Sequence, residues 1–158
     1  MDSGPRPEKV HTKWRIILDI LQRLQRFVGQ HESAVVAFSG GVDSTLLARV
    51  CLDVLGNKVL LVTARTPLIP GEEIRQSREL AESLGAKQEF ISPDIMSNTG
   101  LIENRSDRCY RCKKVLFTEI IKRANAAGLR DVFDGSNVDD SDDYRPGRKA
   151  LEELGVIS

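Results

Sequence analysis

The sequence predicts an α/β domain with a central parallel β-sheet. Short apolar runs rich in β-branched residues alternate along the chain with longer segments whose apolar residues recur at helical spacing. A glycine follows most of the helical segments, a position at which it commonly ends a helix. Strands that alternate with helices form a parallel sheet through right-handed crossovers, and 158 residues leave room for one such domain.

The first helix and the first strand follow a leader without a regular pattern. Residues 1–10 contain two prolines and a glycine but no periodic apolar face, so we expect a disordered leader before a domain over 11–158. Apolar residues recur at helical spacing from Trp14 to Val28 and predict an amphipathic helix. Residues 34–38 read Ala-Val-Val-Ala-Phe, an unbroken apolar run that is typical of a strand buried on both faces.

The middle of the chain repeats this alternation. Helical spacing runs from 46 to 55, and the apolar run over 59–64 predicts a second buried strand. Residues 72–84 predict another helix, and 88–91 predict a weaker strand. No period is clear from 92 to 107, and because structureless connections of that length are uncommon in compact domains, we expect a functional or mobile loop there.

The last third of the chain predicts a helix over 113–127, a short strand over 131–134 and a helix over 148–154. Residues 156–158 follow without a complete element, and we expect the natural chain to continue beyond them.

Composition argues against several classes of function. Lys plus Arg and Asp plus Glu both number 23, so no global field draws the chain to nucleic acid, and aromatic residues at 5% are too sparse for a base-stacking platform. No run approaches the roughly 18 to 20 apolar residues of a membrane span. Three cysteines without a signal-peptide pattern favour a reducing cytoplasm over a disulfide framework.

The strongest local motif lies between the first strand and the next helix, where residues 39–44 read Ser-Gly-Gly-Val-Asp-Ser. Glycines let the backbone approach an anion closely, and the N-terminus of the helix supplies N–H donors and a positive dipole. The sequence lacks the Walker A and Rossmann glycine patterns at this turn. The phosphate-binding residues predicted here are Ser39, Gly40, Gly41, Val42, Asp43 and Ser44.

Asp43 is the unexpected member of this loop, because a carboxylate beside phosphates is repelled. We expect Asp43 either to cap the helix or to meet the phosphates through Mg²⁺. In open α/β sheets, ligands bind across the carboxyl ends of the strands. That rule adds to the predicted ligand site the residues Ala37, Phe38, Thr63, Ala64, Arg65 and Gly135. Arg65 is the candidate cation for the phosphates, although an arginine in a loop can also be merely solvated.

The hexapeptide over 39–44 resembles the PP-loop of the ATP pyrophosphatases, which include ammonia-dependent NAD synthetases, GMP synthetases, asparagine synthetases and tRNA thiolation enzymes. The resemblance implies a three-layer, adenine-nucleotide alpha-hydrolase-like fold that binds ATP and Mg²⁺. It also implies adenylation, in which a substrate oxygen attacks the α-phosphate of ATP and pyrophosphate leaves into the loop. The catalytic residues expected on this basis are Asp43, Ser44, Arg65 and Arg145.

Two further segments resemble one branch of that superfamily. Residues 104–113 contain Arg-Cys-Tyr-Arg-Cys-Lys, and residues 134–147 read Asp-Gly-Ser-Asn-Val-Asp-Asp-Ser-Asp-Asp-Tyr-Arg-Pro-Gly. Together with the loop, they resemble the ATP-dependent sacrificial sulfur transferases, the LarE family. The resemblance implies adenylation of a carboxylate on a nicotinate-derived mononucleotide, sulfur insertion in nickel-pincer cofactor biosynthesis, and a homo-oligomer, specifically a hexamer.

The source of sulfur is the point at which this chain departs from that family. The family uses either a sacrificed cysteine or an iron–sulfur cluster, both in a C-terminal half, and we expect this chain to lack that region. Three interpretations of Cys109 and Cys112 stay open: a role in sulfur transfer or cluster binding, a redox role, or simple local packing. Their basic neighbours are expected to favour the thiolates, whereas Cys51 is expected to be buried and inert.

The acidic run after residue 136 has two interpretations. Asp139 and Asp140 could hold Mg²⁺ or position Arg145, or the run could be a solvated loop. Three other functions stay open beside sulfur insertion. They are tRNA thiolation, amidation as in NAD or GMP synthetases, and an ATP- or AMP-binding module without a complete reaction.

Overall fold

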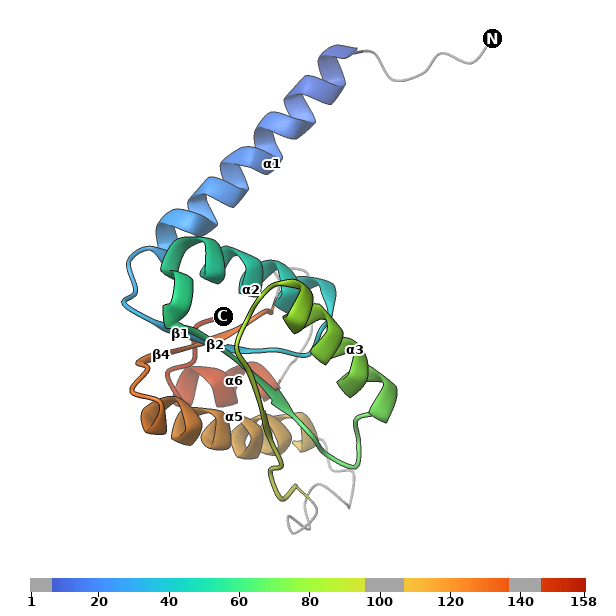
Figure 1. Ribbon diagram of the computed structural model, residues 1–158, viewed down its shortest axis with the longest axis vertical. Coiled ribbons are helices and arrows are strands. Elements are labelled where there is room, and N and C mark those ends of the chain that lie inside the picture. The colour runs from blue at the N-terminus through green and yellow to red at the C-terminus, as the bar shows by residue number, and fades with distance from the viewer. Residues whose placement is uncertain (1–6, 96–106, 137–145) are drawn as a thin grey trace.

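The computed structural model describes residues 7–95, 107–136 and 146–158 (Figure 1). Its helices are α1 (Pro7–Val28), α2 (Val42–Leu55), the short 3₁₀-helix η1 (Gly56–Lys58), α3 (Gly71–Ser83), α5 (Arg108–Ala126) and α6 (Pro146–Glu153). Its strands are β1 (Ala34–Ala37), β2 (Val59–Ala64), β3 (Gln88–Ile91) and β4 (Asp131–Asp134).

The four strands form one parallel sheet in the order β3-β2-β1-β4. The chain therefore moves outward from β1 to β3 and then crosses to the other side of β1 for β4. The end of the chain extends this second edge. Ile157 N–H donates to the Val132 carbonyl at 2.9 Å, and Asp134 N–H donates to the Ile157 carbonyl at 2.8 Å. The sequence patterns did not predict this pairing, because it joins only one residue to β4.

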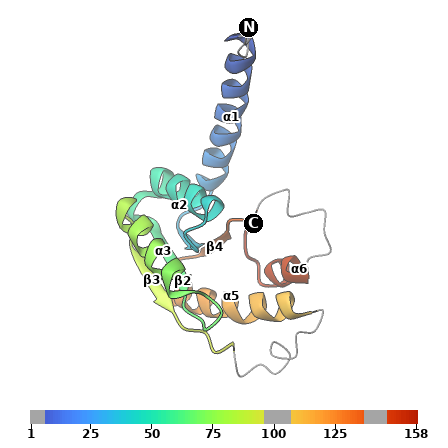
Figure 2. The ribbon, with the colours of Figure 1, turned by 90° about the vertical axis from the view of Figure 1, so that its right-hand side faces the viewer.

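Helices cover both faces of the sheet, with α2 and α3 on one face and α5 and α6 on the other (Figures 1 and 2). Alternate strand residues point to opposite faces, so Val36 and Leu61 pack with the α2 side, and Val35 and Leu60 pack with the α5 side. All six residues of β2 are buried. The predicted α/β fold with a central parallel sheet is confirmed.

Two element boundaries differ from the sequence prediction. Helix α1 begins at Pro7, so residues 7–10 are helical rather than part of a disordered leader. Proline fits the first position of a helix, because its missing N–H needs no partner there. Helix α5 begins at Arg108 rather than at 113, and the Arg111 guanidinium reaches back to Asp107 at 2.6 Å across its first turn.

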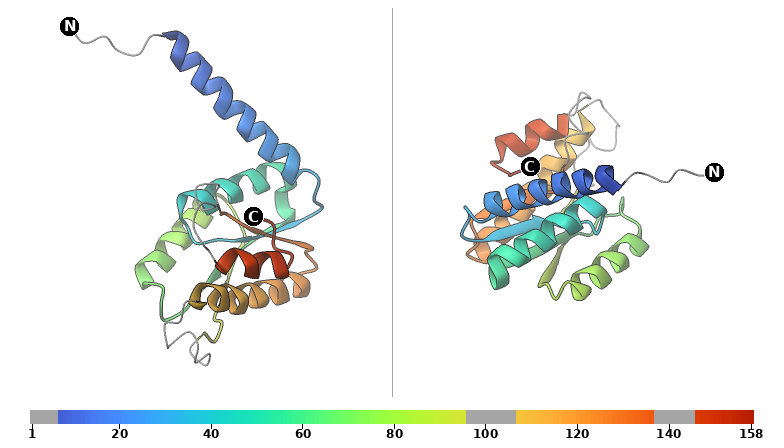
Figure 3. Two further views of the ribbon diagram at one scale, coloured as in Figure 1. Left: turned by 180° about the vertical axis from the view of Figure 1, so that it is seen from behind. Right: turned by 90° about the horizontal axis from the view of Figure 1, so that it is seen from above.

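Helix α1 extends away from the rest of the domain (Figures 1 and 3). Its last turns pack on the core through Val28, with Leu21 and Leu24 partly buried, whereas Trp14 is 61% exposed and Leu18 is 55% exposed. The described part of the chain has no helix that combines the length and the apolar character needed to cross a membrane.

Candidate functional site

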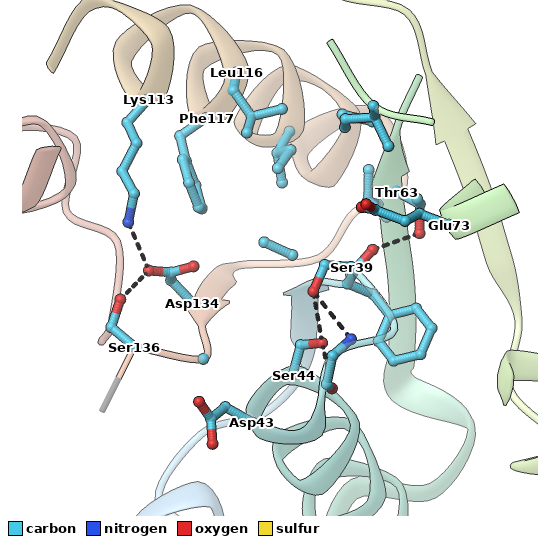
Figure 4. Close-up of a pocket in the computed structure, with 18 of the residues that line it drawn as sticks. Ser39, Asp43, Ser44, Thr63, Glu73, Lys113, Leu116, Phe117, Asp134 and Ser136 are labelled. Atoms are coloured by element: carbon cyan, nitrogen blue, oxygen red, sulfur yellow. Dashed lines mark hydrogen bonds and ion pairs between the residues drawn. The ribbon is translucent and has the colours of Figure 1, made fainter. Parts of the chain in front are cut away.

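A cavity of about 340 Å³ opens at the carboxyl ends of β1 and β2. Its walls come from the loop after β1, the first turn of α2, the start of α3, the middle of α5 and the residues that end β4 (Figure 4). The cavity therefore lies where the strand order reverses between β1 and β4, the place at which open α/β sheets bind ligands.

The loop at residues 39–44 is braced by its own hydroxyl groups (Figure 4). The Ser44 hydroxyl donates to the Gly41 carbonyl at 3.1 Å and lies 3.1 Å from the Ser39 hydroxyl. Gly41 N–H donates to the Ser39 oxygen at 3.2 Å. Gly41 is also the N-cap of α2, so the helix dipole and the N–H groups of its first turn lie at the cavity.

Two glycines allow this loop to pack against its neighbours. Gly40 has a φ of +82°, and a Cβ atom there would lie 3.0 Å from the Ser77 Cα atom of α3. A Cβ atom on Gly135 would lie 3.0 Å from both the Cα and the N atoms of Ser44. The turn after β4 therefore touches the backbone of the first turn of α2, and only glycine permits that approach.

Lys113 is a functional candidate that the sequence prediction did not place in the nucleotide site. Its ammonium lies 3.2 Å from the Asp134 carboxylate, which also accepts a hydrogen bond from the Ser136 hydroxyl at 2.5 Å (Figure 4). Among the described residues that line the cavity, Lys113 is the only basic one. The sequence signal that could have identified Lys113 is its position directly after Cys112 in the Arg-Cys-Tyr-Arg-Cys-Lys segment.

The space around the Lys113 side chain is shaped by α6. A Cβ atom on Gly147 would lie 3.1 Å from Lys113 Cδ, so glycine at the start of α6 leaves room for the aliphatic stem. The side chain is 36% exposed, and the Asp134 side chain is 16% exposed. The ammonium is therefore held at the cavity by a partly exposed ion pair.

An apolar wall faces the loop across the cavity. It is formed by Leu116, Phe117 and Ile120 of α5, by Ile69 just before α3 and by Ile74 in its first turn. Phe117 and Ile120 also belong to the buried core, so one face of α5 both packs on the sheet and lines the cavity. An apolar slot next to the loop at residues 39–44 suits a flat nucleobase.

Most of the predicted nucleotide-binding residues are brought together at the cavity. Those that line it are Ala37, Phe38, Ser39, Gly41, Val42, Asp43, Ser44, Thr63, Ala64 and Gly135. Asp43 is the second residue of α2 and is exposed. Asp43 and Asp134 together place two carboxylates on the wall, and carboxylate oxygens are ligands that Mg²⁺ prefers. Arg145, Asp139 and Asp140 lie outside the described residues.

Two predicted residues, Gly40 and Arg65, do not line the cavity. Gly40 packs against Ser77 of α3, whereas Arg65 lies beside the edge strand. Its guanidinium lies 3.9 Å from the centroid of the Phe90 ring, and it does not line the cavity. Arg65 N–H donates to the Ile91 carbonyl at 2.7 Å, which continues the pairing of β2 with β3 beyond Ala64. This pairing keeps Arg65 beside the edge strand, so the cation at the cavity is Lys113 instead.

The cysteines differ from one another in their surroundings. Cys51 is buried, as predicted, and burial raises its pKa to about 11. Burial also raises the pKa of Cys112, helped by Cys109, and these effects exceed the opposing effects of Arg108 and Lys113. The expectation that basic neighbours favour the thiolate is therefore wrong for Cys112. The described residues contain no group of three or more potential metal ligands.

These differences predict an order of alkylation. At pH 8, iodoacetamide should label the exposed Cys109 first, whereas Cys112 and Cys51 should react more slowly because their raised pKa values leave less thiolate. Timed labelling followed by peptide mass spectrometry measures the three rates. Raising the pH should speed up the labelling of Cys112 and Cys51, and equal rates for all three thiols at pH 8 would contradict the structure.

Comparison with known proteins matches residues 14–130 to the family described as NAD synthase. The chain is 38% identical over 148 residues to the pyridinium-3,5-bisthiocarboxylic acid mononucleotide synthase of Lactiplantibacillus plantarum, covering 93% of this chain and 51% of that protein. It is 40% identical over 135 residues to an uncharacterized protein of Synechocystis sp., covering 85% of this chain and 50% of that protein. The chain thus spans about half the length of these curated relatives.

Solved structures agree on the fold. The NH3-dependent NAD synthetase from Campylobacter jejuni superposes with a TM-score of 0.61 at 19% identity, covering 76% of this chain and 56% of that chain. At this identity the likeness shows the fold alone. The family match and the sequence identity show more than the fold. The chain belongs to the NAD synthase family of PP-loop ATP pyrophosphatases and is a homologue of the bacterial mononucleotide synthase.

Proposed function

We propose that the chain binds ATP in this cavity, with the pyrophosphate on residues 39–44, and adenylates a substrate carboxylate. The observation that carries the proposal is the convergence of three features on one spot. The N-terminus of α2 faces the cavity, Gly135 packs closely against the first turn of that helix, and Lys113 lines the same cavity. This arrangement offers backbone donors and one cation to a polyphosphate, and the apolar wall of α5 accommodates the base.

Each group has a distinct task in this proposal. The N–H groups of the loop and the first turn of α2 bind the β- and γ-phosphates, with the Ser44 hydroxyl beside them. Lys113 turns from Asp134 to an oxygen of the α-phosphate, where negative charge grows as the substrate oxygen attacks. The bond to the bridging oxygen then breaks, and pyrophosphate leaves on the loop. Mg²⁺ held by Asp43 and Asp134 would neutralise phosphate charge.

The residues that lie outside the described part keep the roles expected from the sequence. We propose Arg145 as a further cation for the substrate, and Asp139 and Asp140 as additional Mg²⁺ ligands. Arg65, whose guanidinium lies over the Phe90 ring, has no contact with the nucleotide in this proposal.

We propose a nicotinate-derived mononucleotide as the carboxylate substrate and sulfur insertion as the following step. The support is the 38% identity to a protein named for making a pyridinium bisthiocarboxylic acid mononucleotide. Sulfur would come from a part of the whole protein beyond the region matched here, because the chain spans about half of that relative. A sulfur or cluster role for Cys109 and Cys112 stays a proposal.

Two rival functions have specific support. Amidation is favoured by the match to the NAD synthase family, and a binding module without turnover is favoured by the half-length coverage. Pyrophosphate release separates them. With ATP, Mg²⁺ and pyridinium-3,5-dicarboxylic acid mononucleotide, we expect release that depends on the dicarboxylate. Release only with nicotinic acid adenine dinucleotide and ammonia would indicate amidation, and ATP binding without release would indicate a module.

We also propose a cytoplasmic homo-oligomer. The apolar side chains of α1 that are exposed in the single chain, such as Trp14 and Leu18, support assembly, and the three free cysteines suit a reducing compartment. Light scattering coupled to size-exclusion chromatography measures the mass, for which a hexamer is the value that the family resemblance implies.

A further inference from the structure

Gln88 occupies a position behind the phosphate-binding loop that neither the motifs nor the cavity lining reveal. It is the first residue of edge strand β3 and is half-buried. Its amide nitrogen donates to the Thr63 hydroxyl at 2.8 Å and to the Ser77 hydroxyl at 3.3 Å. Thr63 belongs to β2 and Ser77 to α3, so one side chain joins three elements.

Both partners of Gln88 touch the loop. The Thr63 hydroxyl, which is 3% exposed as a residue, donates to the Phe38 carbonyl at 2.6 Å, and Phe38 is the last residue before the loop. Ser77 is fully buried, and its Cα atom is the one that a Cβ atom on Gly40 would meet at 3.0 Å. Thr63 thus fixes the entry of the loop, and Ser77 supports its apex.

The hydroxyl protons of Thr63 and Ser77 fix which groups donate and which accept in this hydrogen-bond network. The Thr63 hydroxyl has one proton, which goes to the Phe38 carbonyl, and the Ser77 hydroxyl gives its proton to the Ile74 carbonyl at 2.8 Å. Each hydroxyl can then only accept from Gln88. The two N–H bonds of a single amide nitrogen match this demand, and a carboxylate of the same shape does not.

We propose that Gln88 is a positioning residue for the phosphate-binding loop, acting through Thr63 and Ser77 on the entry and the apex of residues 39–44. This inference rests on the proposed binding of ATP at that loop. It assigns to Gln88 no contact with the nucleotide, because Gln88 does not line the cavity. Replacing Gln88 should therefore weaken the binding of pyrophosphate more than the binding of AMP.

The isosteric variant Gln88→Glu gives a direct test. An ionised carboxylate would draw the Thr63 proton away from the Phe38 carbonyl, so the loop entry would lose its hydrogen bond. We expect the Kd for pyrophosphate and for ATP to rise about tenfold at pH 8, the size of one lost hydrogen bond. The Kd for AMP should change less than about threefold. The matched control is Gln22→Glu on the exposed side of α1, which adds the same charge and should leave every Kd unchanged.

A pH series separates positioning from a merely structural role. Protonation of the introduced carboxylate at acidic pH would let it donate to Thr63 again, so the ratio of the variant Kd to the wild-type Kd should fall from about ten toward about three by about pH 5. A structural role would lower Tm and leave this ratio flat. Calorimetric titration with pyrophosphate, ATP and AMP, at a temperature well below both Tm values, gives all these constants.

The outcomes separate this inference from the proposed function. Wild-type binding of ATP together with an unchanged Kd in Gln88→Glu would overturn the positioning role and leave the proposed function intact. Equal weakening of AMP and pyrophosphate binding, or a ratio independent of pH, would also overturn it. Absence of ATP binding by the wild-type chain would overturn both.

Discussion

Replacing Lys113 with methionine is expected to lower kcat/KM for pyrophosphate release about 100-fold to 1,000-fold. Methionine keeps most of the side-chain volume beside Gly147 and removes the only cation among the described residues that line the cavity. Loss of one electrostatic contact to the charge that develops in a transition state costs about this factor. Steady-state assays should show the loss mainly in kcat, because the charge on the α-phosphate grows during the reaction.

The neighbouring lysine provides the control for that result. Lys114 pairs with Glu153 of α6 at 2.7 Å and does not line the cavity, so Lys114→Met removes the same charge from the same helix. We expect kcat/KM of this variant to stay within about threefold of the wild type, because a partly exposed ion pair contributes little to stability or field. Equal losses in the two variants would show that helix charge, rather than the position of Lys113, matters.

Replacing Gly135 with alanine is expected to raise the Kd for ATP about tenfold to 100-fold, the size of one lost hydrogen bond to a charged group. The added Cβ atom would meet the Ser44 Cα and N atoms at 3.0 Å, and both belong to the backbone of the first turn of α2. The turn after β4 or the start of α2 must therefore shift by a few tenths of an ångström. Such a shift moves the N–H groups of that turn away from the positions proposed for binding phosphate, and the loss of one hydrogen bond to a charged group costs about this factor. Calorimetric titration with ATP measures the change.

Gly71 provides the control for the glycine substitution. It is the first residue of α3, and a Cβ atom there would have no neighbour within 4 Å. Gly71→Ala should leave the Kd for ATP unchanged and should not lower Tm, because alanine favours the helix over glycine. If Gly135→Ala also bound ATP like the wild type, the close approach of the β4 turn to α2 would not shape the site.

The sequence was sufficient to predict the parts of the site that are local. The apolar run of β1, the glycines and the helix after them occupy consecutive positions, so one stretch of sequence specifies strand, loop and helix dipole together. Gly135 was also predictable, because β4 is parallel to β1 and its carboxyl end must lie at the same edge of the sheet. Both predictions depend on backbone geometry rather than on side-chain packing.

The parts that depend on side chains from distant segments could not be predicted in the same way. Lys113 meets Asp134 only because α5 packs beside β4, and Gln88 reaches Thr63 only because β2 and β3 pair in one register. Arg65 was misplaced for a related reason. The extra backbone pairing of Arg65 with Ile91 prolongs the edge of the sheet by one residue and keeps the side chain beside Phe90.

The proposed reaction splits ATP between its α- and β-phosphates on residues 39–44. Phosphorus-31 NMR of a reaction with ATP, Mg²⁺ and the pyridinium dicarboxylate mononucleotide tests this most directly. The structure and the family together predict equal amounts of AMP and pyrophosphate, with formation of both strongly reduced in Gly135→Ala and Lys113→Met at equal enzyme concentration. Formation of ADP and orthophosphate, or ATP that stays intact in the presence of the wild-type chain, would contradict the account.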